Sequence, residues 1–242
     1  MKRIEIVTHV YAKILPHYAQ ALTYQLSSLN LYRSKADVSI MICLDMTDAK
    51  AVEVLLWFSL QYSFPIKIRN FPIERLGRRA IGRNIVARET EADVVWFTDV
   101  DYLFGEGCLD AVADFVWPEK SGLAFPHYVQ MSHDHELGDS ILSEAVYPQL
   151  VDVDPKDFYP HEVTQPPGGC FIIKGDFARE HGYLPGHKKY QSPTDGVFLS
   201  CKCDVPYRSY CKRNGDGAKV IEIPNVFRIR HTKTAHKHGA QM

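Results

Sequence analysis

A single α/β domain built around a mixed, mostly parallel sheet is the fold that the sequence predicts. Continuous apolar runs with the length of buried strands occur at residues 4–7, 38–44, 66–68 and 94–97. Segments with apolar residues at helical spacing separate them, at 18–31, 49–60 and 79–91. Strands that alternate with helices favour a parallel sheet with helices on both faces.

The second half of the chain follows a less regular pattern. Strands are expected at 123–129, 168–173, 220–223 and 226–229, and short helices at 177–181 and 196–201. The polar stretch 130–166 is rich in His, Asp and Pro, and its one helical candidate is at 141–147. An irregular stretch of this length in a compact domain is usually functional or mobile.

Composition limits the class of protein. Hydrophobic residues make up 45% of the chain, enough for a sizeable core, and the formal net charge of -1 gives no general sign of nucleic-acid or membrane binding. No apolar run approaches the roughly 20 residues of a spanning helix, and the first ten residues do not form a signal peptide. We therefore expect a soluble, cytoplasmic protein with no built-in tether.

The six cysteines are expected to be free thiols in a reducing compartment, because disulfide frameworks usually belong to smaller secreted chains. Cys201, Cys203 and Cys211 leave a zinc site as the alternative. Their spacing matches no common structural zinc site.

Two carboxylates, Asp99 and Asp101, follow the predicted strand 94–97. Ligands of parallel sheets bind beyond the carboxyl ends of the strands. Paired carboxylates in that position suit Mg²⁺ or Mn²⁺, which also bind diphosphate oxygens. Such an ion would neutralise the charge that develops on a leaving diphosphate. The alternative is a solvated turn after a strand.

Residues 94–101, Val-Val-Trp-Phe-Thr-Asp-Val-Asp, resemble the strand and Asp-x-Asp motif of GT-A glycosyltransferases, particularly family 2 and the related galactosyltransferases. Residues 82–88, Gly-Arg-Asn-Ile-Val-Ala-Arg, resemble the Ala-Arg-Asn segment that precedes this motif in family 2. The resemblance covers roughly the first 110 residues and recurs at 168–200. It implies a GT-A, Rossmann-like fold and a metal-dependent transfer of a sugar from a nucleotide-sugar donor, expected to be UDP-linked, to a hydroxyl acceptor.

By this resemblance residues 1–110 would form the half that binds the nucleotide sugar. Residues 111–230 would form the acceptor half, with the irregular loop 130–166, and residues 231–242 a basic tail. The acceptor stays open between a glycan, a protein and a modified nucleobase.

The resemblance also implies roles for single residues of the first half. Asp101 would bind the metal, and Asp99 would contact the metal or the ribose. Arg83 would meet the diphosphate or the donor sugar, and Asn84 would shape the same pocket. Arg83 has an alternative interpretation as a charge on an exposed helix face.

Two further donor contacts are implied at the ends of the first two strands. Thr8 would lie against the nucleotide, although the neighbouring His9 departs from the family pattern. Asp45 would contact the base. Asp48, close behind it, is expected to cap the following helix instead.

In the second half, Gly168 and Gly169 resemble the glycines that open the strand flooring the donor and acceptor site; a tight turn after two prolines is the alternative. Asp195 resembles the carboxylate at a helix start that faces the acceptor, with Thr194 in place of the usual Glu. It would be the general base of an inverting transfer. Its alternative role is a helix N-cap.

The last predicted strand leads to His231, which by the resemblance would complete the metal shell, and Lys233 would contact the diphosphate. The tail behind them would close over bound donor. A second metal site at His127, His133 and His135 is the less favoured interpretation of a polar acceptor loop.

Two other function classes compete with the glycosyltransferase. A sugar nucleotidyltransferase also joins an α/β sheet to an acidic metal site, but its early glycine-rich loop is missing from residues 8–16. A non-catalytic glycan-binding member of the same fold would not require the acidic residues to be kept.

Overall fold

Seven strands form the main sheet of the computed structural model, which describes residues 1–143, 148–193 and 203–232. Their spatial order is β10-β6-β9-β4-β1-β2-β3. Within the described residues β9 alone runs antiparallel to its neighbours, so the sheet is mixed and mostly parallel, as predicted. The strands span Arg3–His9 (β1), Asp37–Leu44 (β2), Ile66–Asn70 (β3), Val94–Thr98 (β4), Leu123–Pro126 (β6), Cys170–Lys174 (β9) and Ala218–Ile221 (β10).

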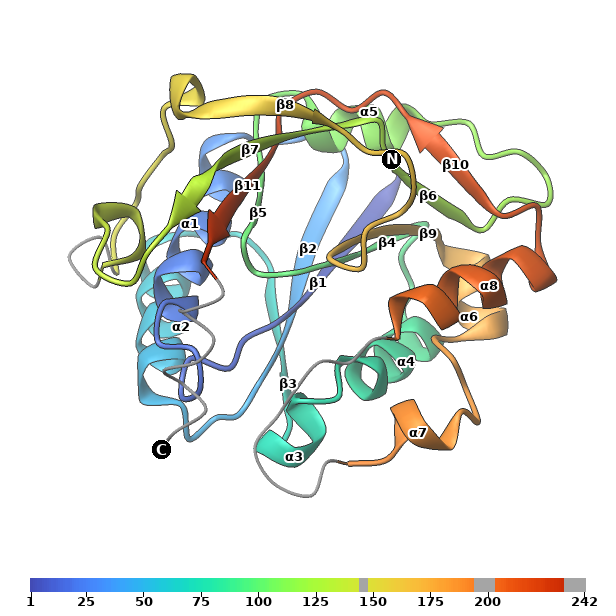
Figure 1. Ribbon diagram of the computed structural model, residues 1–242, viewed down its shortest axis with the longest axis horizontal. Coiled ribbons are helices and arrows are strands. Elements are labelled where there is room, and N and C mark those ends of the chain that lie inside the picture. Colours follow the sequence, from blue (N-terminus) through green and yellow to red (C-terminus); the bar gives the residue numbers. More distant parts are fainter. Residues whose placement is uncertain (144–147, 194–202, 233–242) are drawn as a thin grey trace.

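Helices cover both faces of this sheet, with α1 and α2 on one side and α4, α6 and α8 on the other (Figure 1). The predicted helices 18–31, 49–60 and 79–91 are confirmed to within two residues. The helices span Tyr18–Leu31 (α1), Ala49–Gln61 (α2), Ile73–Leu76 (α3), Arg79–Glu89 (α4), Cys108–Asp114 (α5), Gly175–His181 (α6), Lys188–Gln191 (α7) and Asp204–Asn214 (α8).

A second sheet lies beside the first, in the order β5-β11-β7-β8. Strands β7 and β8 of this second sheet lie largely within residues 130–166, which were expected to be irregular. That expectation is wrong for these two strands. A short 3₁₀ turn at Ser140–Leu142 replaces the start of the expected helix 141–147, and another lies at Pro155–Asp157. The strands span Tyr102–Phe104 (β5), Tyr128–His135 (β7), Phe158–Glu162 (β8) and Val226–His231 (β11).

The expected single strand 123–129 is divided between the two sheets. Strand β6 ends at Pro126, which has no N–H to donate to a further partner. The next residue, His127, donates its backbone N–H to the Ile221 carbonyl and accepts one from Val163. The chain therefore changes sheets at a proline.

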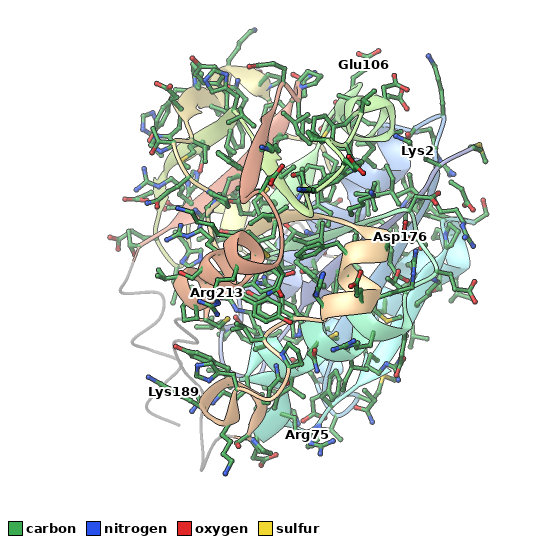
Figure 2. The ribbon with its side chains drawn as sticks, turned by 90° about the vertical axis from the view of Figure 1, so that its right-hand side faces the viewer. Lys2, Arg75, Glu106, Asp176, Lys189 and Arg213 are labelled. Carbon is green, nitrogen blue, oxygen red and sulfur yellow. The ribbon has the colours of Figure 1, made fainter. Side chains whose placement is uncertain are left out.

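The core is centred on β4 and β9, which pair antiparallel from Val94–Lys174 to Thr98–Cys170. All five residues of β4 are buried, and the Trp96 indole donates to the Cys170 sulfur at 3.2 Å. The cysteines in the described ranges are free and buried. Charged side chains mostly face outward, as those labelled in Figure 2 do.

None of the helices in the described ranges combines the length and the apolar character that a membrane crossing requires. The expected helix 196–201 lies outside the described residues.

Helix α2 begins directly after Asp48, the residue predicted to cap it. Asp48 accepts the Ala51 N–H at 3.3 Å with one carboxylate oxygen and the Lys13 N–H at 2.9 Å with the other. The side chain therefore ties the loop after β1 to the start of α2.

Replacing Asp48 with Ala should lower the free energy of unfolding by about 1–2 kcal/mol, because two backbone donors lose their acceptor. Urea unfolding measures this. Asp114→Ala, at an exposed position, is the control and should change stability by less than about 0.5 kcal/mol. Equal effects of the two substitutions would contradict the capping role.

Candidate functional site

The Asp99-Val100-Asp101 segment joins the two sheets, because it leaves β4 of the first and leads into β5 of the second. The Asp99 N–H donates to the Gly169 carbonyl, and the Ile229 N–H donates to the Asp101 carbonyl, both at 2.9 Å. The segment is thus fixed from β9 on one side and β11 on the other. It lies at the carboxyl end of β4, next to that of β1, where open α/β sheets bind ligands.

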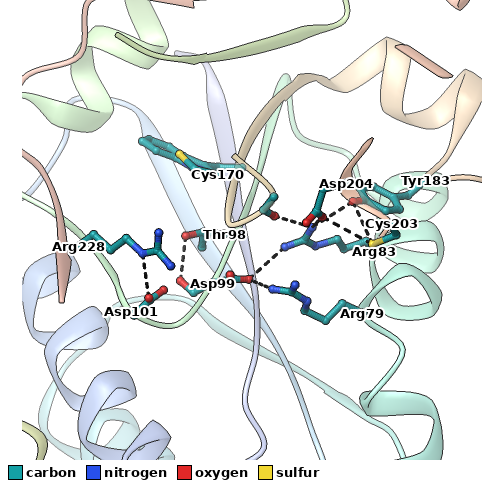
Figure 3. Close-up of polar contacts among 12 residues, drawn as sticks. Arg79, Arg83, Thr98, Asp99, Asp101, Cys170, Tyr183, Cys203, Asp204 and Arg228 are labelled. Atoms are coloured by element: carbon teal, nitrogen blue, oxygen red, sulfur yellow. Dashed lines mark hydrogen bonds and ion pairs between the residues drawn. The ribbon is translucent and has the colours of Figure 1, made fainter. Parts of the chain in front are cut away.

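Helix α4 directs two arginines at Asp99. Arg79 and Arg83 lie one turn apart and so share a face of the helix. Arg79 donates from Nη1 to Asp99 Oδ1, and Arg83 Nη2 lies 3.5 Å from the same oxygen (Figure 3). Burial acts to raise the pKa of Asp99, but the arginines, led by Arg79, outweigh it and lower the pKa to about 2. Asp99 is therefore an anion at neutral pH.

Arg83 is fully buried, so its alternative interpretation as an exposed helix-face charge is wrong. Its Nη1 donates to the Gly168 carbonyl at 3.0 Å and to the Tyr183 hydroxyl at 3.1 Å, and lies 3.9 Å from an Asp204 oxygen. Its guanidinium carbon lies 5.4 Å from the centre of the Tyr183 ring. These contacts fix the guanidinium beside Asp99.

Asn84 acts on the site through another residue. Its side-chain oxygen accepts the Tyr183 N–H at 2.9 Å, and Tyr183 in turn contacts Arg83. A Cβ on Gly182 would lie 2.5 Å from that oxygen, so the backbone there comes close to Asn84. In this structure Asn84 positions Tyr183.

Asp101 is paired with an arginine from the second sheet. Arg228 on β11 donates from Nε to Asp101 Oδ2 at 3.0 Å, and its guanidinium carbon lies 5.1 Å from the Tyr102 ring centre. Asp101 chiefly accounts for the raised pKa of Arg228. The second carboxylate oxygen, Asp101 Oδ1, is buried and has no hydrogen-bond partner among the described residues.

The glycines before β9 allow the backbone to approach the acidic residues. A Cβ on Gly169 would lie 2.7 Å from Asp99 Oδ2, and one on Gly168 would lie 1.8 Å from Asp204 Oδ2. The alternative interpretation, a turn after the prolines, also holds, because the Cys170 N–H donates to the Pro167 carbonyl at 2.9 Å.

The carboxylates suit a divalent cation of the magnesium type. Asp101 Oδ1 is an orphaned buried acceptor, and Asp99 Oδ2 lies outside the contacts with Arg79 and Arg83. Mg²⁺ usually binds through one or two carboxylates plus substrate phosphates and water. In the described ranges no three His, Cys, Asp or Glu side chains are grouped as a complete protein-only site.

His231 lies at the end of β11, as predicted, but packs on another histidine. Its ring centre is 4.6 Å from that of His17 and 6.4 Å from that of Tyr18. The structure therefore does not group His231 with Asp99 and Asp101 as a set of metal ligands.

Two residues predicted to contact the donor, Thr8 and Asp45, lie near the ends of β1 and β2. The Thr8 side chain is fully buried. Asp45 accepts hydrogen bonds from Thr47 and lies 3.4 Å from Lys13 Nζ. Asp195 and Lys233 lie outside the described residues.

The three histidines near β7 are held separately. His127 lies 2.6 Å from a Glu222 oxygen, and His135 lies 3.3 Å from an Asp139 oxygen. The His133 ring faces the Tyr159 ring, with centres 5.7 Å apart. Within the described part of the chain they form no metal-binding group.

Comparison with known proteins identifies the fold. No protein-family model and no curated protein matches the chain. TarS of S. aureus matches with a TM-score of 0.57 and 14% identity over 99% of this chain. GalNAc-T7, solved with UDP, GalNAc and Mn²⁺, matches with 0.55 and 11% over 100%. Both are glycosyltransferases of the GT-A type.

The chain has the GT-A fold. It spans 38% of the matched TarS chain and 48% of the GalNAc-T7 chain. A third match, the inositol-1-phosphate CTP transferase of T. maritima, has a TM-score of 0.53 and 11% identity, covering 99% of this chain and 96% of that chain. At these identities the shared property is the fold.

The candidate site contains three charged residues that the sequence patterns did not predict: Arg79, Asp204 and Arg228. Arg79 precedes Arg83 by four residues in a predicted helix, so helical spacing alone places both on one face. Arg228 is a charge inside the apolar run 226–229, which was a usable signal. Asp204 carries no local signal, because its contact with Arg83 depends on the packing of α8.

His9 packs against α4, the helix that carries Arg79 and Arg83. It is buried, both ring nitrogens lack partners among the described residues, and a Cβ on Gly82 would lie 2.4 Å from Nε2. Burial, followed by Arg83 and Arg79, lowers the pKa of His9 well below its ordinary value. The ring is therefore neutral in the folded protein.

This predicts a pH-dependent loss of stability. An unfolded histidine binds a proton below about pH 6.5, whereas folded His9 does not. The unfolded state thus takes up more protons, and stability falls by up to about 1.4 kcal/mol per pH unit as pH drops below 6.5. Urea unfolding from pH 7.5 to 5.5 should show a shallower fall for His9→Gln than for the wild type. His161→Gln, at an exposed position, should keep the wild-type slope; equal slopes for His9→Gln would contradict the prediction.

Proposed function

We propose that this protein is a metal-dependent glycosyltransferase that moves a sugar from a nucleotide-sugar donor, UDP-linked, to a hydroxyl acceptor. The observation that carries the proposal is the pairing of Asp99 and Asp101 with arginines at the carboxyl ends of β4 and β1. Carboxylates and guanidiniums together suit a diphosphate with its metal. The GT-A fold is consistent with this use.

The arginines are suited to the leaving group. Arg83 is held rigidly by Gly168 and Tyr183, so its guanidinium needs no reorganisation before the reaction. Charge that develops on the diphosphate oxygens would be stabilised by such fixed donors. Asp99 and Asp101 would hold Mn²⁺ or Mg²⁺, with His231 as a further ligand after rearrangement. When bound, the ion would neutralise the leaving diphosphate.

In the proposed inverting reaction the acceptor oxygen attacks the anomeric carbon of the donor sugar. The bond from that carbon to the diphosphate oxygen breaks, and the diphosphate leaves with the electron pair. Asp195 takes the proton of the acceptor hydroxyl as general base. Asp204 is less suited to this role, because Arg83 lies 3.9 Å from its carboxylate.

The remaining donor contacts are proposed at the strand ends and the glycines. Thr8 and Asp45 would lie near the nucleoside, Gly168 and Gly169 would floor the sugar site, and Lys233 would reach the diphosphate. The acceptor is a hydroxyl of a glycan, a protein or a modified nucleobase.

A nucleotidyltransferase is the second candidate, because the T. maritima CTP transferase matches over nearly its whole chain. The two reactions differ in their products. A glycosyltransferase releases a nucleoside diphosphate from a nucleotide sugar, whereas a nucleotidyltransferase releases pyrophosphate from a nucleoside triphosphate.

The test is metal-dependent release of nucleoside diphosphate from a panel of nucleotide sugars. Asp101→Asn should lower the Mn²⁺-stimulated rate by about a hundredfold or more, because the leaving charge loses its stabilisation. Coupled detection of UDP measures the rate.

Asp134→Asn is the matched control, since Asp134 also pairs with an arginine, Arg230, at 2.9 Å on the same strand as Arg228. It should keep the wild-type rate. Purified protein that neither binds nor turns over any common nucleotide sugar would refute the proposal, and pyrophosphate release from nucleoside triphosphates would favour the second candidate.

A further inference from the structure

We propose that Arg79 and Arg228 bind the diphosphate of the donor. In the free protein these arginines are paired instead with Asp99 and Asp101, respectively. Diphosphate binding would transfer both guanidiniums from the carboxylates to the phosphate oxygens and so prepare the carboxylates for the divalent ion. The inference deepens the proposed function and rests on it for the identity of the nucleotide.

The three arginines of the site differ in accessibility. The Arg83 side chain is 0% exposed and is held by the Gly168 carbonyl and the Tyr183 hydroxyl. The side chains of Arg79 and Arg228 are 16% and 31% exposed. Part of the Arg79 and Arg228 side chains is therefore open to solvent, whereas Arg83 is closed off, so a ligand that enters from solvent can meet these two while Arg83 stays in place.

The partners of these two arginines are also few. Arg79 makes its side-chain hydrogen bond to Asp99, and its buried Nε has no partner among the described residues. Arg228 makes its side-chain hydrogen bond to Asp101 through Nε. A guanidinium has five N–H donors in a planar fork, so both retain donors for a ligand rich in acceptors. A diphosphate is such a ligand, because its oxygens accept bidentate hydrogen bonds from arginine.

Charge balance links the two ligands. Three guanidiniums face three carboxylates in this network, Asp99, Asp101 and the Asp204 that lies 3.9 Å from Arg83, so the charges are matched before any ligand binds. A diphosphate adds negative charge that the arginines can meet. The two aspartates then lose their counter-charge, and a divalent cation restores it. Bound diphosphate should therefore raise the affinity for the metal, and bound metal should raise the affinity for the diphosphate by the same factor.

The competing interpretation is that both pairs are structural and persist when ligands bind. The two interpretations predict different effects of removing an arginine on diphosphate binding. If the arginine exchanges partners, it competes with the metal for its aspartate in the free protein. Its removal then strengthens binding of the metal alone and weakens binding of the diphosphate alone. A purely structural pair leaves diphosphate binding unchanged.

The experiment measures two affinities separately for Arg79→Gln and Arg228→Gln. Free Mn²⁺ is followed by electron paramagnetic resonance without nucleotide, and binding of UDP and of inorganic pyrophosphate by calorimetry with EDTA present. Each variant should bind Mn²⁺ alone about tenfold more tightly and both diphosphates about tenfold more weakly, because one charge-assisted contact is removed in each case.

Two matched controls come from β11 itself and from α3, the helix before α4. Arg230→Gln removes an arginine from β11 that pairs with Asp134. Arg75→Gln removes one from α3, where the side chain is exposed at the surface (Figure 2). Both should leave the two affinities unchanged. Arg79→Lys keeps the charge but loses the planar fork, and its diphosphate affinity should lie between those of Arg79→Gln and the wild type.

A measurement on the wild type covers the case in which a variant fails to fold. Without metal, pyrophosphate should shift the guanidinium ¹⁵N–¹H signals of Arg79 and Arg228 and leave that of Arg75 in place. Unchanged signals, or arginine variants with wild-type diphosphate affinity, would overturn the proposal. Pyrophosphate binding that follows the predicted pattern without any turnover of nucleotide sugars would sustain it while refuting the proposed glycosyl transfer.

Discussion

The pairing of Asp99 with the two arginines of α4 is the interaction on which the site depends. A carboxylate at the end of a fully buried strand requires a compensating charge, because burial strongly disfavours an unpaired anion. Arg79 and Arg83 supply it. Their position in turn requires α4 to pack with one face toward the carboxyl end of β4. Gly169 must lack a side chain, because a Cβ there would crowd Asp99.

The second sheet secures the other half of the motif. Strand β11 supplies the Ile229 N–H to the Asp101 carbonyl and the Arg228 guanidinium to the Asp101 carboxylate. A segment that crosses from one sheet to another is thereby held at both ends by backbone hydrogen bonds. This explains how two acidic side chains can be kept in a fixed arrangement before any ligand is bound. Such preorganisation is what electrostatic catalysis needs.

Local patterns were sufficient to predict the elements of the first half of the chain but not the contacts between distant segments. The strand 94–97, the helix at 79 and the cap at Asp48 follow from apolar spacing and short-range hydrogen bonding. The antiparallel direction of β9 and the pairing of Asp204 with Arg83 depend on how segments far apart in the chain pack together. The division of 123–129 at Pro126 was readable in principle, since proline has no donor for a continued strand. The roles of Asp195 and Lys233 stay predictions.

A crystal structure of the protein with UDP and Mn²⁺ tests the central claim most directly. We expect the diphosphate at the carboxyl ends of β4 and β1, with its oxygens on Arg79, Arg83 and Arg228 and the ion on the carboxylates of Asp99 and Asp101. Nucleotide bound elsewhere, or bound here with Arg79 and Arg228 still paired to the aspartates and no ion between carboxylate and phosphate, would contradict the account.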